Sequence, residues 1–145
     1  MDFGNLYVET AIGDVASRNT IIPYKELLDT VQSNLGKELY RSMFLYSEEI
    51  LDHVKEHGSV KAFKGIQALD KITFDIDVGS GGSKQLMLKT TEFVENLTSR
   101  GTKQDYIQIW FSGRGFHIVI PDLYGFTPSK HIAREVKSTL VRDFG

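Results

Sequence analysis

The sequence predicts a mixed α/β (α+β) fold whose second half follows the order β-α-β-β-α. Three observations lead to this prediction. Residues 71–77 alternate between apolar and polar side chains, residues 86–97 repeat apolar side chains at helical spacing, and two β-rich runs at 106–111 and 116–120 flank a glycine-containing turn. The first half, residues 1–70, is expected to be mainly helical.

The length and composition fit a single globular domain spanning residues 1–145. No apolar run approaches the roughly 20 residues of a membrane-spanning helix, so no membrane partner is expected. The chain has no cysteine, which excludes disulfides and thiolate zinc sites and is typical of a reducing compartment such as the cytoplasm. The formal charge of −2 excludes a basic, sequence-independent DNA-binding body, so any nucleic-acid contact must come from a local patch.

Two helices are predicted in the first half. One begins at Pro23, a residue suited to a first helical turn, and is followed by apolar residues at helical spacing: Leu27, Leu28 and Val31. The other runs from Ser47, a favourable N-cap, to His57, with Gly58 as its stop signal.

The second half begins with a strand, Lys71–Asp77, whose residues Ile72, Phe74 and Ile76 share the core-facing side. The glycine-rich loop 79–83 ends it, and the helix that follows closes at Gly101. That loop lacks the Gly-Lys-Ser/Thr ending of a phosphate-binding loop, so it is interpreted as a flexible connection.

The next two strands, 106–111 and 116–120, are joined by the tight turn Ser112–Gly115. A last helix is expected from Thr127-Pro128, an N-cap followed by an N1 proline, with its apolar face formed by Ile132, Val136 and Leu140. The split βαβ, ferredoxin-like unit has the order β-α-β-β-α-β, so the final strand of that unit is missing here. Because this would leave the strand 71–77 with an unpaired edge, we expect a following segment or a partner chain to supply it.

Asp75 and Asp77 lie two residues apart on a strand, so both carboxylates point to the face opposite the core. Two adjacent carboxylates suit a hard divalent cation, Mg²⁺ or Mn²⁺, which prefers oxygen ligands and leaves positions for phosphate oxygens. The alternative is a pair of solvated strand acids near a turn. The Asp-x-Asp pattern alone does not exclude it.

His117 alternates with core-facing neighbours and therefore shares the open face of Asp75 and Asp77 if the strands are neighbours in one sheet. Ser112 and Arg114 precede it in a glycine-flanked turn, where backbone N–H groups and a guanidinium suit phosphate oxygens. The alternatives are an ordinary hairpin turn and a structural histidine. The joint pattern is more specific than either half.

The segments Phe74-Asp75-Ile76-Asp77 and Ser112-Gly113-Arg114-Gly115-Phe116-His117 resemble the first two motifs of the archaeo-eukaryotic primase superfamily. The resemblance covers roughly residues 40–120, and it implies an RRM-like catalytic sheet. By this resemblance Asp75 and Asp77 would bind the divalent metals and act in catalysis. Ser112, Arg114 and His117 would bind the triphosphate of an incoming nucleotide. The implied partners are nucleoside triphosphates and a single-stranded DNA template.

The family has a third motif, an acidic residue on the strand after the second helix. Residues 141–145 lie where that strand should begin, and Asp143 belongs to a helical pattern and is not given the role. The expectation is that a C-terminal segment or a second chain supplies both the last strand and the third carboxylate, so that residues 71–145 form a partial metal- and nucleotide-binding portion.

Several weaker features have a structural interpretation as the default. Arg41, Lys61 and Lys64 could touch the template or the triphosphate, although solvated surface charge is the default interpretation. Trp110 and Phe111 could stack on bases but are interpreted as core aromatics at a strand end. His53 and His57, four residues apart on a helix, are interpreted as surface residues.

Three function classes follow. The first is a DNA primase or primase-polymerase that makes or extends primers in replication, located in the cytoplasm, a nucleoid or a viral replication complex. The second is a non-catalytic RRM-like subunit that binds nucleotide or single-stranded nucleic acid within a split enzyme. The third is a metal-dependent glycosyltransferase, which would leave the Ser-Gly-Arg-Gly-Phe-His turn unexplained.

Overall fold

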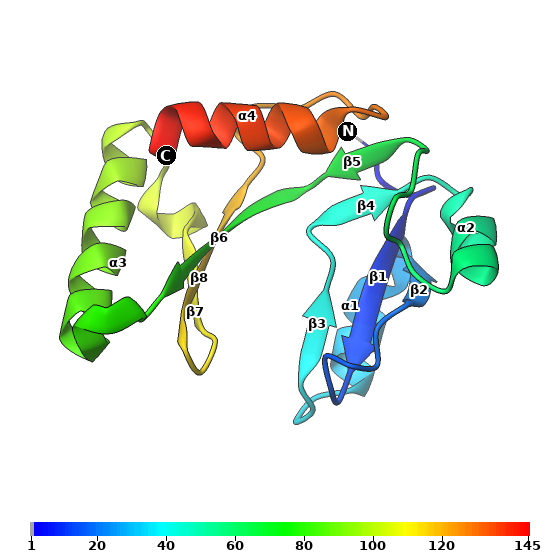
Figure 1. Ribbon diagram of the computed structural model, residues 1–145, viewed down its shortest axis with the longest axis horizontal. Helices are drawn as coiled ribbons and strands as arrows, with labels where there is room; N and C mark the ends of the chain where they lie inside the picture. The colour runs from blue at the N-terminus through cyan, green and yellow to red at the C-terminus, as the bar shows by residue number, and fades with distance from the viewer. Residues whose placement is uncertain (1) are drawn as a thin grey trace. The chain divides into compact units, whose positions relative to one another are not determined.

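The computed structural model describes residues 2–145 and divides into two compact units (Figure 1). The first unit runs from the N-terminus to Leu69 and also includes Phe126–Gly145, and the second unit is Asp70–Gly125. The described residues form a mixed α+β fold with four α-helices and two antiparallel sheets, which confirms the predicted class. Residues 126–145 therefore group with the first unit although they follow the second unit in the sequence.

The first unit is built on an antiparallel sheet in the order β2-β1-β4-β5, with β3 also paired to β1. Its strands are β1 Tyr7–Ile12, β2 Thr20–Pro23, β3 Leu39–Arg41, β4 Phe44–Tyr46 and β5 Gln67–Leu69. Its helices are a 3₁₀ turn at Tyr24–Glu26, α1 Leu27–Ser33, α2 Ile50–His57 and α4 Ile132–Phe144.

The prediction of a mainly helical segment over residues 1–70 is wrong, because five strands lie there. The central strand β1 is buried at four successive positions, Val8 to Ala11, so it shows no alternation of apolar and polar residues. Three of the other strands have only three residues each, which is too short for a periodic pattern. Pro23 ends β2 opposite Tyr7 and is also the N-cap of the 3₁₀ turn Tyr24–Glu26, which leads directly into α1 at Leu27, so the helix expected from Pro23 is present with a 3₁₀ first turn.

The core of the first unit forms around Val8, Leu45 and Ala68, which come from three adjacent strands and are fully buried. Beside it β1 carries a buried carboxylate, Glu9, which is 4% exposed. Burial raises the pKa of the neighbouring Tyr46 hydroxyl above its ordinary value of 10.0, and the negative charge of Glu9 adds to this effect.

The last helix begins later than predicted. Thr127 and Pro128 precede an extended segment in which Ser129 and Gln67 exchange two backbone hydrogen bonds of 3.0 Å each. This pairing with β5 holds the backbone out of the helical region, so α4 starts only at Ile132. The buried residues of α4 are Ile132 and Val136, as the predicted apolar face requires.

The second unit is a three-stranded antiparallel sheet in the order β6-β8-β7, with one long helix along one face (Figure 1). Its elements are β6 Lys71–Asp77, a 3₁₀ turn at Gly79–Gly81, α3 Gly82–Ser99, a 3₁₀ turn at Gln104–Tyr106, β7 Gln108–Phe111 and β8 Gly115–Pro121. The predicted strand over 71–77 is confirmed at both ends. The strand expected at 106–111 begins only at Gln108, because the residues before it form the 3₁₀ turn. The connection interpreted as a flexible loop is also wrong in part, since it holds the 3₁₀ turn and the start of α3.

One face of this sheet packs on α3. Ile72, Ile118 and Ile120 are buried on the strands, and Leu86 and Leu97 are buried on the helix. On the same face the rings of Phe74 and Phe93 lie 4.7 Å apart between their centroids. The core therefore occupies the helix-facing side of the sheet, which leaves the other side of β6 and β8 for polar residues.

Candidate functional site

Asp75 and Asp77 lie on the face of β6 that points away from α3. Their neighbours Ile72, Phe74 and Ile76 occupy the other face, as strand alternation requires, and both aspartates are exposed. The structure therefore places the two carboxylates together, at the end of a strand whose apolar side is fixed by the core.

The pairing of β6 with β8 brings His117 directly opposite Asp75. The imidazole Nε2 of His117 lies 3.4 Å from Oδ1 of Asp75, and the two side chains are 44% and 60% exposed. Sequence alternation put His117 on this face, but only the strand register sets it beside Asp75 and not beside another residue of β6.

The turn before β8 is a tight hairpin connection. The Ser112 N–H donates to the Gly115 carbonyl at 2.9 Å, and Gly113 has a φ of +90° at the first of the two central positions. The Ser112 hydroxyl accepts a 3.1 Å bond from the Gly115 N–H, so it stabilises the turn and can still donate its own proton to a ligand oxygen. Arg114 is exposed in the turn, and its carbonyl accepts a bond from the Val78 N–H at 3.2 Å.

The strand β7 adds a residue to this face that sequence reasoning assigned to the core. Trp110 pairs with His117 in the sheet register and is 61% exposed, so Trp110, His117 and Asp75 form one row across the three strands. The interpretation of Trp110 and Phe111 as core aromatics is wrong. A signal was present: in the run 106–111, Trp110 shares its parity with Gln108, whereas Ile109 and Phe111 share the other face.

The three basic residues proposed as weak nucleic-acid contacts belong to the first unit. Arg41 donates from Nε to the Ser42 carbonyl at 2.9 Å, and its guanidinium lies 5.9 Å from the ring centroid of Tyr24. Lys61 and Lys64 are exposed in the connection after α2. The roles of these three residues stay predictions.

Two further histidines lie on α2. The His53 ring nitrogen Nε2 is 2.9 Å from the Lys61 carbonyl oxygen, and its ring centroid is 4.6 Å from that of His57. Both fit the surface interpretation, with His53 helping to position the loop that follows the helix. On α4, Asp143 pairs with Arg142 at 2.8 Å.

The donor chemistry of the face suits a divalent cation. Within residues 2–145, no three His, Cys, Asp or Glu side chains gather closely enough to form a ligand set by themselves. Mg²⁺ is commonly held by one or two carboxylates together with water and substrate phosphates. Asp75 and Asp77 supply two hard oxygen donors that are open to solvent, so the residues present fit such an ion.

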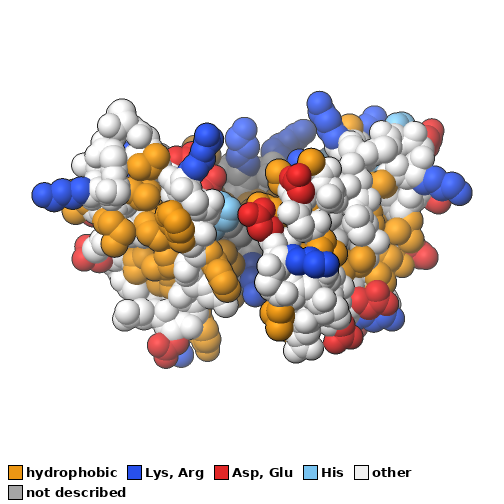
Figure 2. Space-filling model, turned by 90° about the horizontal axis from the view of Figure 1, so that it is seen from below, with side chains coloured by type: hydrophobic (Ala, Val, Ile, Leu, Met, Phe, Trp, Pro, Cys, Tyr) orange, Lys and Arg blue, Asp and Glu red, His pale blue; other side chains and the backbone are white. Residues whose placement is uncertain are grey.

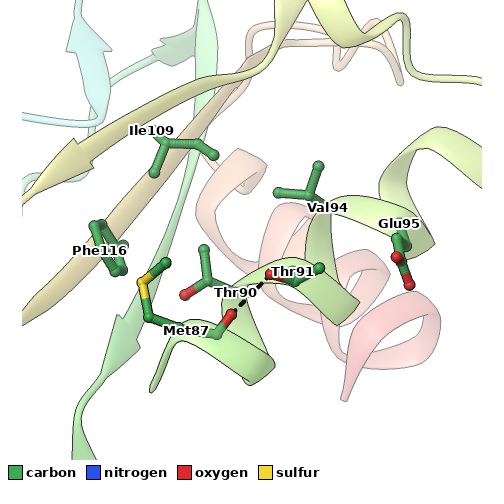
Figure 3. Close-up of a pocket in the computed structure, with 7 residues that line it drawn as sticks. All are labelled: Met87, Thr90, Thr91, Val94, Glu95, Ile109 and Phe116. Carbon is green, nitrogen blue, oxygen red and sulfur yellow. Dashed lines mark hydrogen bonds between the residues drawn. The ribbon is translucent and has the colours of Figure 1, made fainter. Parts of the chain in front are cut away.

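A separate apolar groove lies on the other face of the sheet, between α3 and the hairpin (Figure 3). Its volume is about 290 Å³, and in the figure Met87 lies near Phe116 while Val94 points toward Ile109. Because Ile109 and Phe116 alternate with Trp110 and His117, the groove and the carboxylate face lie on opposite sides of the sheet.

Comparison with known proteins found no match: no family model fits the chain, and neither the curated proteins nor the solved structures contain a significant relative. No helix among residues 2–145 is long and apolar enough to cross a membrane.

Proposed function

We propose that this chain carries part of the active site of a DNA primase or primase-polymerase, a metal-dependent enzyme that transfers nucleotides onto a growing strand along a template. One observation carries the proposal: Asp75, Asp77 and His117 share one solvent-accessible face of a three-stranded sheet, with Asp75 and His117 in direct cross-strand contact. The glycine-flanked turn with Ser112 and Arg114 lies at the end of the same hairpin. Such an activity would work in the cytoplasm or in a nucleoid or viral replication complex.

The arrangement of the second unit supports the RRM-like part of the proposal. The strands β6 and β7 are joined through α3 and lie on either side of β8, which is the split βαβ arrangement of that fold. In the proposed enzyme a following segment or partner chain adds the last strand beside β6 and brings the third carboxylate.

The chain's own residues have distinct roles in the proposed reaction. Asp75 and Asp77 would hold Mg²⁺ or Mn²⁺, which when bound activates the attacking hydroxyl and neutralises the leaving pyrophosphate. Arg114 offers a planar fork to phosphate oxygens, and the Ser112 hydroxyl donates to another. His117 lies opposite Asp75, two residues beyond the turn residue Gly115, with one ring nitrogen toward Asp75 and the other available to a phosphate oxygen.

The test is a calorimetric titration of the purified chain with a nucleoside triphosphate in the presence of Mn²⁺. We expect metal-dependent binding of the nucleotide, with an affinity at least tenfold lower in the Asp75→Asn/Asp77→Asn double variant, because both metal-binding side chains lose their negative charge. His117→Ala should weaken nucleotide binding without changing the metal requirement. The matched control is Glu92→Gln/Asp105→Asn, which removes two exposed charges of the same unit from outside the site.

Equal binding by the wild type and the aspartate variant would overturn the assignment. In an enzyme completed by the missing strand, the same aspartate variant should also abolish primer extension. Continued extension would contradict the catalytic role even if nucleotide binding fell.

A non-catalytic binding subunit is the second candidate, and the open sheet face with its exposed Trp110 favours it. The two candidates differ in their dependence on metal. Single-strand binding that survives a chelator, in a chain that never binds nucleotide with Mn²⁺, would favour the binding subunit.

A further inference from the structure

We infer that the outer strand β7 binds single-stranded nucleic acid, with Trp110 as the stacking platform for one base. The inference rests on the proposed function, in which that strand is the template, and it names the residue that holds the template. Nothing in the roles given to Asp75, Asp77, His117, Ser112 and Arg114 requires Trp110.

Trp110 is placed for contact with a ligand and not for packing. It is 61% exposed, although tryptophan is usually well buried on average, and the core of the second unit lies on the opposite face of its strand. Its indole Nε1 donates one long hydrogen bond, 3.4 Å, to Oε1 of Gln108 on the same face of β7. This contact orients the indole and leaves its ring surface accessible.

The segments on either side of β7 carry basic and aromatic side chains, the types that proteins use to bind single-stranded nucleic acid. Before the strand, the ammonium of Lys103 lies 5.9 Å from the ring centroid of Tyr106, which is 52% exposed. After it comes the exposed Arg114 of the turn. We call Lys103, Tyr106, Trp110 and Arg114 the β7 track. Figure 2 shows hydrophobic side chains gathered on the surface of the second unit, at the left of that view.

The geometry favours a polymer over a lone nucleotide. In the sheet row, Trp110 is one strand from His117 and two strands from Asp75, or about 5 and 10 Å at the usual strand spacing. Without metal, the carboxylates of Asp75 and Asp77 repel the phosphates of a nucleic acid. Its phosphate backbone is therefore more stable near β7, where Lys103 and Arg114 supply positive charge. Because β7 is an outer strand of its sheet, a chain stacked on Trp110 can continue past the edge.

Stacking on an aromatic ring tolerates any base, since every base presents a π face. The inferred binding is therefore independent of sequence and of metal. These two properties distinguish the inferred binding from that at the nucleotide site on the same face, with which the β7 track shares Arg114.

Trp110 is the only tryptophan of the chain, so its fluorescence reports on the inferred site directly. The experiment titrates the full chain with an oligo-dT of about 12 nucleotides in the presence of a chelator. We expect saturable quenching that persists in the Asp75→Asn/Asp77→Asn variant. In anisotropy measurements with a labelled oligonucleotide, Trp110→Ala should weaken binding about tenfold, whereas Trp110→Phe should lose less.

Phe111→Ala is the matched control. Phe111 neighbours Trp110 on the same strand and is 70% exposed, but it points to the opposite face and lies beside Phe116. The control should bind the oligonucleotide as the wild type does. An equal loss in Phe111→Ala and Trp110→Ala would overturn the inference, because it would indicate a non-specific apolar effect.

The remaining outcomes separate this inference from the proposed function. Nucleotide binding with Mn²⁺, but no quenching by oligo-dT and no effect of Trp110→Ala, would overturn the inference and leave the proposed function standing. Quenching by oligo-dT without any metal-dependent nucleotide binding would support the inference and overturn the proposed function. Quenching by a nucleoside triphosphate but not by oligo-dT would also overturn it, since the occupant would then be a mononucleotide.

Discussion

Gly115 connects the candidate site to the backbone that supports it. It begins β8 opposite Asp77, and its N–H and carbonyl both bond to Ser112. A Cβ built at this position would collide with the main-chain carbonyl oxygen of Ile76. The approach of β6 and β8 beside the carboxylates therefore requires the absence of a side chain.

We predict that Gly115→Ala destabilises the second unit by about 3 kcal/mol, because the two strands must separate to admit a methyl group. Trp110 fluorescence during urea unfolding measures this unit specifically. The control is Gly113→Ala, which meets no atom within 4 Å and carries only the strain of a positive φ, about 1 kcal/mol. If the two variants are equally stable, the close approach of the strands is not the constraint.

Unlike the close approach of the strands at Gly115, the contact between His117 and Asp75 contributes little to the stability of the fold. Both side chains are about half exposed, and ion pairs in such positions contribute about 0–1 kcal/mol to folding. The pair is therefore a minor element of stability. It follows that His117→Ala reports on ligand binding without a large change in the folded fraction.

Among the structural elements, the β1–β2 connection depends on one buried carboxylate. Glu9 accepts a 3.2 Å bond from Nη2 of Arg18 and a 3.0 Å bond from the backbone N–H of Asn19. Asn19 has a φ of +71°, a conformation that non-glycine residues rarely adopt. The side chain of Glu9 thus holds the far end of the loop in a strained conformation.

We predict that Glu9→Ala lowers the stability of the first unit by about 2 kcal/mol, since it removes the charged acceptor of the hydrogen bonds from the Asn19 N–H and from Arg18. Arg18→Ala should cost less than about 1 kcal/mol, because the Arg18 side chain is 59% exposed. Urea unfolding followed by far-UV circular dichroism measures both. A larger loss from Arg18→Ala would mean that the ion pair, and not the backbone bond, fixes the loop.

The elements differ in how well the sequence predicts them, and burial explains why. The strand β6 packs one face and exposes the other, so its alternating sequence predicts both its ends and its apolar side. The strand β1 is buried at four successive positions, and therefore on both faces, so it gives no such pattern. The late start of α4 depends on the bond between Ser129 and Gln67, a contact 62 residues apart that no local preference encodes.

The candidate site shows the same division. Alternation alone places Asp75, Asp77 and His117 on open strand faces. The contact between Asp75 and His117 requires the register of β6 with β8, which depends on the crossover through α3 and on the turn at Ser112–Gly115. The residue type of Trp110 favours a core position at a strand end, whereas its parity with Gln108 indicates the open face.

For the whole molecule, the charge limits how nucleic acid can bind. The chain has 17 basic and 19 acidic residues, a formal net charge of −2, so it attracts no polyanion through its overall field. Binding at the β7 track must therefore come from stacking on Trp110 and from the two local cations Lys103 and Arg114. A binder of this kind differs from a basic groove chiefly in its response to salt.

We predict a shallow salt dependence for oligo-dT binding. Each phosphate neutralised on a single strand contributes about −0.7 to the slope of log K against log salt concentration, so two cations give a slope of about −1.4. The double variant Lys103→Ala/Arg114→Ala should flatten the slope toward zero while the quenching of Trp110 persists at low salt. The measurement is a series of anisotropy titrations between about 50 and 200 mM salt. A slope steeper than about −3 would require more than four phosphate contacts, and the strand would then follow a wider basic surface than the β7 track.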